Sequence, residues 1–167
     1  FPDGLPNLKG KDLKKTQEGN ALADVTAISL EVGDRAGAAG VAENPWRSRL
    51  WQRARLRAAL AVIGAFEVIL DFCAYGEEWR KRTCLYGNLA GLESLGITCS
   101  SFRTCTFTGR AHRTLSGKDA SGRYWTLVAQ PYPLRLCVAV ADLVAAAAAE
   151  GDARAPRPCG CRGCAPG

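Results

Sequence analysis

Two cysteines and the only histidine of the chain lie in one short stretch and could bind a metal ion. Thiolate sulfur and imidazole nitrogen are the ligands that structural zinc prefers, and Cys99, Cys105 and His112 supply both kinds. A tetrahedral site needs a fourth ligand, for which Cys84 is the candidate. The spacing is not a paired CxxC pattern, so ordinary buried cysteines and a loop histidine are the alternative. Zinc is the cofactor that these residues predict.

Glu43-Asn44-Pro45 follows a short apolar run and precedes a helix-forming segment. Asn44 is suited to accept hydrogen bonds from the free N–H groups of that helix, and Pro45 to occupy its first position, so both have structural roles. Glu43 has none in this interpretation. A carboxyl group at the rim of a closed site can hold its proton, when burial raises its pKa, and donate to a ring nitrogen. A solvated acidic residue before a helix is the alternative.

Two groups of basic residues could contact nucleic-acid phosphates. The first repeats at every fourth position of a helix-forming segment and consists of Arg49, Arg53 and Arg57. The second is a charged turn that holds Arg80, Lys81 and Arg82. Trp46 or Trp51 could stack on an exposed base beside the first group. A solvated helix face and a basic turn in water are the alternatives.

Length and composition favour one globular domain with a tail. The chain has 167 residues and a net charge of +6, which favours a polyanionic partner. The sequence begins at Phe1 without a secretory segment, which suggests a fragment. Its apolar runs are shorter than the roughly 20 residues that a membrane span needs. The eight cysteines are then best interpreted as reduced thiols in the nucleus or cytoplasm. We expect Cys73, Cys84 and Cys137 to pack as small buried hydrophobic residues.

The apolar periodicity predicts the elements that must position these groups. Helices are expected from Leu13 to Val32 with an interruption at Gly19-Asn20, over 46–63, over 89–95 and from Pro133 onward; strands are expected over 39–42, 66–72 and 83–86. Residues 96–123 are expected to be mostly irregular. Helices and strands in alternation predict an α/β fold with a parallel sheet and crossover helices.

Several ordered blocks of the sequence resemble those of a known family. The blocks are Gly19-Asn20, Glu43-Asn44-Pro45, Asp71-Phe72-Cys73-Ala74-Tyr75-Gly76, Arg80-Lys81-Arg82-Thr83, His112, Tyr132-Pro133 and Leu136-Cys137. Together they resemble the methyltransferase-like domains of phages and retroelement-type eukaryotic polyproteins, distant relatives of DNA cytosine-5 methyltransferases. The resemblance covers most of residues 1–145. It implies a Rossmann-like sheet that binds S-adenosylmethionine and a DNA substrate.

The resemblance also assigns roles to residues. Glu43 matches the Glu that contacts the flipped cytosine and assists attack at its ring, although Pro45 stands where the family has Val. Arg80 and Arg82 match a block near the target base, from which the Gln is missing. The cofactor-binding glycine loop and the Pro-Cys nucleophile block belong to the front half of the family domain and have no match here.

Residues 1–148 are therefore expected to form the C-terminal part of a methyltransferase-like domain that is inactive without its upstream half. Two alternatives stay open: a non-catalytic nucleic-acid-binding module of a mobile-element polyprotein, and a degenerate relic. The composition of residues 149–167 predicts a low-complexity basic tail. A disordered tail or a metal-binding tail would both suit its three cysteines, Cys159, Cys161 and Cys164.

Overall fold

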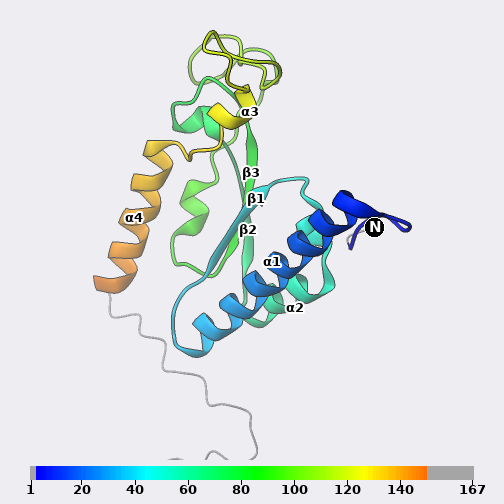
Figure 1. The fold of residues 1–167 in the computed structure, drawn as a ribbon. Helices are drawn as coiled ribbons and strands as arrows, with labels where there is room; N and C mark the ends of the chain where they lie inside the picture. The colour runs from blue at the N-terminus through cyan, green and yellow to red at the C-terminus, as the bar shows by residue number, and fades with distance from the viewer. Residues whose placement is uncertain (1–2, 150–167) are drawn as a thin grey trace, which may run out of the picture.

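The computed structural model describes residues 3–149, which form a mixed α/β fold around a small sheet (Figure 1). The strands are β1 (Val41–Pro45), β2 (Phe66–Asp71) and β3 (Arg82–Gly87), in the order β1-β3-β2. The longer helices are α1 (Gly10–Arg35), α2 (Ala54–Val62) and α4 (Leu134–Ala149). Short helical turns are η1 (Arg49–Gln52), η2 (Phe72–Tyr75), η3 (Leu92–Leu95) and α3 (Trp125–Val128). None of these helices is long and apolar enough to cross a membrane.

The sheet differs from the parallel one that the sequence predicted. β3 pairs antiparallel with both β1 and β2, so β1 and β2 run parallel to each other, with η1 and α2 between them in the chain. A parallel neighbour needs a long crossover connection, and residues 72–81 contain only the turn η2. The chain therefore folds back beside β2. The crossover between β1 and β2 is confirmed, but the described residues show no Rossmann-like fold.

The start of the second helical segment also differs from the prediction. Asn44 and Pro45 belong to β1, where they pair with Cys84 and Thr83 of β3, and neither caps a helix. Ser48 provides the cap instead, because its side-chain oxygen accepts a hydrogen bond of 3.2 Å from the Leu50 N–H. The extended backbone of Arg53 then separates η1 from α2. By contrast, α1 continues through the predicted interruption at Gly19-Asn20.

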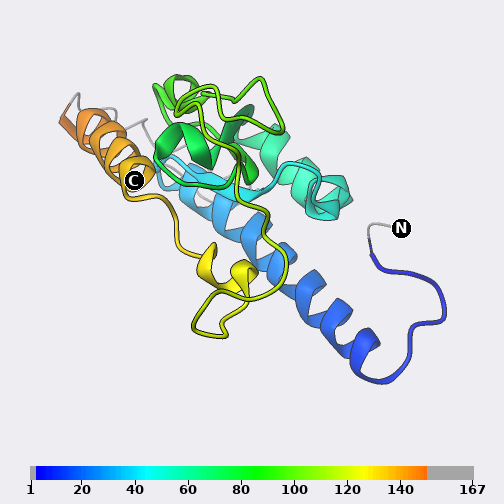
Figure 2. The ribbon, with the colours of Figure 1, turned by 90° about the horizontal axis from the view of Figure 1, so that it is seen from above.

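The sheet lies between two layers, each with its own apolar core. α1 and α4 lie on opposite sides of the sheet in Figure 1, and Figure 2 shows the same two helices from above. On one face, Ala27 and Leu30 of α1 and Leu56 and Leu60 of α2 pack against Ala42 of β1.

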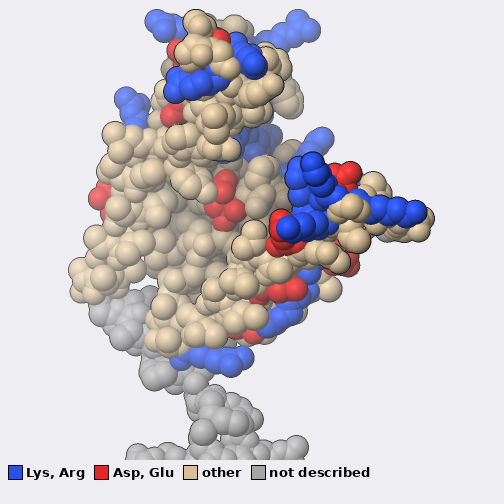
Figure 3. All heavy atoms as spheres, viewed as in Figure 1, with Lys and Arg blue, Asp and Glu red and all other residues tan. Residues whose placement is uncertain are grey.

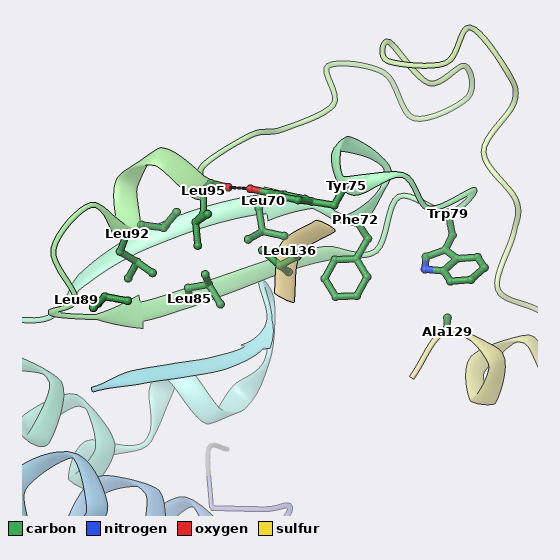
Figure 4. Close-up of a cluster of buried hydrophobic side chains, with 11 residues drawn as sticks. Leu70, Phe72, Tyr75, Trp79, Leu85, Leu89, Leu92, Leu95, Ala129 and Leu136 are labelled. Carbon is green, nitrogen blue, oxygen red and sulfur yellow. Dashed lines mark hydrogen bonds between the residues drawn. The ribbon is translucent and has the colours of Figure 1, made fainter. Parts of the chain in front are cut away.

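The core of the second face surrounds Leu70 of β2 and Leu85 of β3 (Figure 4). Leu136 from α4 and Leu92 from η3 pack against them. The hydroxyl of Tyr75 donates a hydrogen bond of 2.7 Å to the Leu95 carbonyl. This contact ties η2 to η3 and fixes the chain where it leaves β2.

Candidate metal centre

Four metal-ligating side chains meet beyond the end of β2. They are Cys73, Cys99, Cys105 and His112, whose ligand atoms all lie within 4.8 Å of one another. The three cysteines are buried free thiols, and the histidine is half-buried. A tetrahedral zinc ion with bonds of about 2.0–2.3 Å would hold its ligand atoms roughly 3.4–3.8 Å apart. The group could thus hold a metal ion after a small closure of the side chains.

The end of β2 places two of the ligands. Cys73 lies in η2, directly after the strand. Asp71, the last residue of β2, accepts a hydrogen bond of 2.8 Å from the backbone N–H of Cys99 through its Oδ2. Its own N–H donates to the Ile97 carbonyl at 3.0 Å. Asp71 therefore fixes the returning chain so that Cys99 lies beside Cys73.

A small hairpin brings the other two ligands together. Thr104 and Ala111 form an antiparallel bridge. On one side of the bridge the Cys105 N–H donates to the Arg110 carbonyl at 2.7 Å, and on the other the His112 N–H donates to the Arg103 carbonyl at 2.8 Å. The residues between Cys105 and His112 thus form the turn of the hairpin, which brings the two side chains to the same place.

Backbone groups around the site orient its ligands. Nδ1 of His112 lies 3.0 Å from the Phe102 carbonyl, and a proton on Nδ1 would leave Nε2 as the ligand atom. Nε2 lies 3.7 Å from the Cys99 sulfur. The Thr106 N–H donates to the same sulfur at 3.4 Å. A histidine that donates its second ring nitrogen to a carbonyl, and a sulfur that accepts from a backbone amide, are common around bound metals.

The thiols have different acidities. Burial alone would raise the pKa of Cys99, but hydrogen bonds from the Thr106 side chain and backbone outweigh it and lower this pKa to about 6. The pKa of Cys105 is also lowered, because hydrogen bonds from Thr108 and Phe107 outweigh its burial. Burial raises the pKa of Cys73 to about 12. A bound cation would favour loss of this last thiol proton as well.

The sequence predicted three of the four side chains that meet in this group. Cys84, the predicted fourth ligand, lies on β3, where its sulfur donates to Oε1 of Glu67 at 3.4 Å. Cys73 occupies the fourth position of the group, and it is also buried, as the packing prediction required. Cys137 is exposed, which is contrary to prediction, and the three cysteines of the tail lie outside the described residues.

The predicted basic turn surrounds a buried carboxylate next to the metal centre. Arg80 donates to Asp71 at 3.1 Å, and Arg82 donates to both Asp71 oxygens at 2.9 and 2.7 Å. Both guanidinium groups also donate to the Cys99 carbonyl, at 2.8 and 3.3 Å. Burial would raise the pKa of Asp71, yet its hydrogen bonds from Arg82, the Cys99 N–H and Arg80 lower it overall. Lys81 points elsewhere and donates to the Ala129 carbonyl at 3.3 Å.

The predicted arginine stripe is divided by ion pairing. Arg53 is buried and forms ion pairs with Asp3 at 2.7 Å and Asp24 at 2.9 Å. Arg49, in η1, and Arg57, in α2, are exposed. Arg53 therefore attaches the segment before α2 to the N-terminal layer, while the other two can meet a ligand.

Glu43 lies on β1 and is bonded to a residue that precedes α4. The Tyr132 hydroxyl donates to Oε2 of Glu43 at 2.6 Å. The other oxygen, Oε1, is buried and has no hydrogen-bond partner within residues 3–149. Burial and the neighbouring Glu43 raise the pKa of Tyr132 to about 12. The sequence matched Tyr132 only as part of a block and did not foresee this contact.

The two tryptophans proposed for base stacking have different surroundings. Trp51 donates to the Pro45 carbonyl at 3.1 Å and packs against Tyr86, which gives it a structural role. Trp46 has the guanidinium carbons of Arg47 and Arg82 at 5.1 and 5.5 Å from its ring centroid. Only Trp46 is thus associated with cationic side chains.

Comparison of the chain with protein-family models, with curated proteins and with solved structures finds no match.

Proposed function

We propose that this chain is a nucleic-acid-binding module stabilised by one zinc ion. The observation that carries the proposal is the group formed by Cys73, Cys99, Cys105 and His112. Four protein ligands complete a tetrahedral coordination sphere and leave no open position for water or substrate, which is typical of structural rather than catalytic zinc. The role of the ion would be to hold the loop of residues 96–123 against the end of β2.

The charge distribution supports nucleic acid as the partner. The chain carries a net charge of +6, and Lys and Arg side chains gather on the loops at the top of Figure 3 and near the start of α1. Arg103 and Arg110, on the hairpin that supplies two of the ligands, are exposed. Zinc would thus order the backbone that presents these two cations. Ordered cations are the main source of affinity for a phosphate backbone.

Binding should depend steeply on salt and on the exposed arginines. Replacing Arg49 and Arg57 together by Gln is expected to weaken binding to a fluorescent oligonucleotide and to reduce the slope of log K against log [salt] by about 2. Arg35→Gln, an exposed substitution at the opposite end of α1 beside Glu31, is the matched control and should change neither quantity by as much. Binding that does not respond to salt would contradict the proposal.

A second candidate function is the C-terminal part of a DNA cytosine methyltransferase-like domain. Parallel β1 and β2 with an antiparallel strand between them are compatible with a larger α/β sheet, because mixed sheets of this kind are common. The specific feature that favours it is Glu43, which accepts from Tyr132 through Oε2 while its buried Oε1 has no partner within residues 3–149. No described strand is followed by a glycine-rich loop for S-adenosylmethionine. Methyl transfer would therefore need an upstream half.

The test of this second function is Glu43→Gln in a protein that contains such an upstream half. If the carboxyl group assists attack on a flipped base, methyl transfer to DNA should fall by about 100-fold or more, with thermal stability little changed. Tyr132→Phe keeps the carboxyl group and should have a smaller effect. Unchanged methyl transfer by the Gln variant would refute the role of Glu43. Methyl transfer by the present chain alone would refute the need for an upstream half.

A further inference from the structure

Phe102 is an apolar ring that the fold leaves almost entirely in solvent. Its exposed fraction is 82%, the highest among the large hydrophobic residues that are exposed in the described chain. The guanidinium carbon of Arg80 lies 4.0 Å from the ring centroid. One face of the ring is thus covered by a cation, and the high exposure shows that the rest of the ring is open.

Both partners of this stack are fixed by the metal centre. The carbonyl of Phe102 lies 3.0 Å from Nδ1 of His112, which anchors the backbone beside a metal ligand. Arg80 is held by Asp71 at 3.1 Å and by the Cys99 carbonyl at 2.8 Å. A planar ligand on the open face would therefore meet a ring that is already oriented, with little further ordering required.

We propose that Phe102 is a stacking platform for an unpaired nucleobase. The inference rests on the proposed nucleic-acid binding and deepens it, since it selects single-stranded or locally opened nucleic acid as the substrate class. An aromatic ring stacks on any base, and a paired base inside a duplex does not offer its face.

The surroundings favour a nucleic acid over an apolar protein partner. Arg103 follows Phe102 directly, and Arg110 lies across the hairpin from Cys105; both are exposed. The Arg80 guanidinium on the ring and these two exposed cations of the same loop supply positive charge, which suits a phosphate backbone that accompanies a base. Arg80 itself serves as a positioning residue, because it holds the ring from the opposite face.

The chain contains a matched control for this platform. Phe107 belongs to the same hairpin and is 47% exposed, but no cation stacks on its ring among the described residues. Phe102→Ala and Phe107→Ala therefore remove the same side chain from the same loop. Phe102→Trp offers a larger aromatic surface at the proposed position and tests whether stacking is the relevant property.

The experiment compares these variants by fluorescence anisotropy with a single-stranded oligonucleotide and with the corresponding blunt duplex. Phe102→Ala should weaken single-strand binding about tenfold or more at every salt concentration, with an unchanged salt slope and little change for the duplex. Phe107→Ala should bind within about twofold of the native chain, and Phe102→Trp should restore affinity. Zinc content and thermal unfolding of each variant establish that the loop is intact.

The outcomes separate the platform from the function on which it rests. If the native chain binds neither oligonucleotide, both the proposed function and the platform are wrong. If it binds and Phe102→Ala behaves like Phe107→Ala, only the platform is wrong. Loss of self-association in Phe102→Ala, without a change in oligonucleotide affinity, would identify the ring as a protein contact and overturn the platform as well.

Discussion

Cys73→Ser is expected to lose its zinc, whereas Cys84→Ser should retain one ion per chain. The sulfur of Cys73 belongs to the four-ligand group, and that of Cys84 is bonded to Glu67 on β3. Mutation of a group that only orients a ligand lowers metal affinity by up to about 100-fold. Removal of a direct ligand should lower zinc affinity by more than that. Competition with a chromophoric chelator measures this affinity, and elemental analysis after gel filtration measures the content.

This pair of variants is informative because both thiols are buried and free. A general effect of placing a hydroxyl in a buried position would act on both, while loss of zinc should occur in only one. Equal zinc content in the two variants would contradict the assignment of Cys73. Loss of zinc from Cys84→Ser alone would restore the fourth ligand that the sequence first suggested.

Asp71→Asn should be the most destabilising single change near the site. Asp71 is fully buried and is the common acceptor for Arg80, Arg82 and the Cys99 N–H. Removal of its charge leaves two largely buried guanidinium groups without their anion. Breaking a buried pair in this way costs about 3–5 kcal/mol. Urea unfolding with zinc present in excess should show a loss of this size.

The same carboxylate predicts a pH dependence. The pKa of Asp71 is lower in the folded protein than its ordinary value of 3.8. Its contribution to stability is therefore complete above that value and is lost as the pH falls through the folded pKa. The free energy of unfolding is best measured from pH 5 down to about pH 3, a range that spans this ordinary value. It should fall more steeply in the native chain than in Asp71→Asn.

Glu78→Gln is the control for both measurements. Glu78 forms an ion pair of 2.7 Å with Arg113, but both side chains are largely exposed, and exposed pairs contribute little to stability. A loss of stability in Glu78→Gln as large as that in Asp71→Asn would show that burial of the carboxylate is not the cause. A native chain whose stability does not change on acidification would refute the role of Asp71.

The ligands of the metal centre could be predicted where they are local in sequence. Cys105 and His112 belong to one hairpin, and Cys99 lies shortly before it, so residue type alone suggested these three. Cys73 could not be chosen on spacing, because it reaches the group only when Asp71 at the end of β2 binds the Cys99 backbone. That contact joins segments separated in the chain by η2, β3 and η3.

The arginines show a second limit of sequence patterns. Regular spacing made Arg49, Arg53 and Arg57 equivalent, yet Arg53 alone meets Asp3 and Asp24 from the start of the chain and is buried. Periodicity reports which residues share a helix face and contains no information on which carboxylates other segments bring to that face. Most helix and strand positions were predictable, because periodicity reports which residues share a face. The antiparallel pairing of β3 was not predictable, because the pattern does not specify the direction in which the connecting chain runs.

The metal content of the native chain tests the account most directly. Protein purified with zinc and passed through gel filtration should contain one zinc ion per chain, and exchange for Co²⁺ should give the intense visible bands of a tetrahedral site together with thiolate-to-metal charge transfer. Both signals should disappear in Cys73→Ser. A native chain that retains no zinc, or a cobalt form with octahedral bands and no thiolate charge transfer, would contradict the proposed centre.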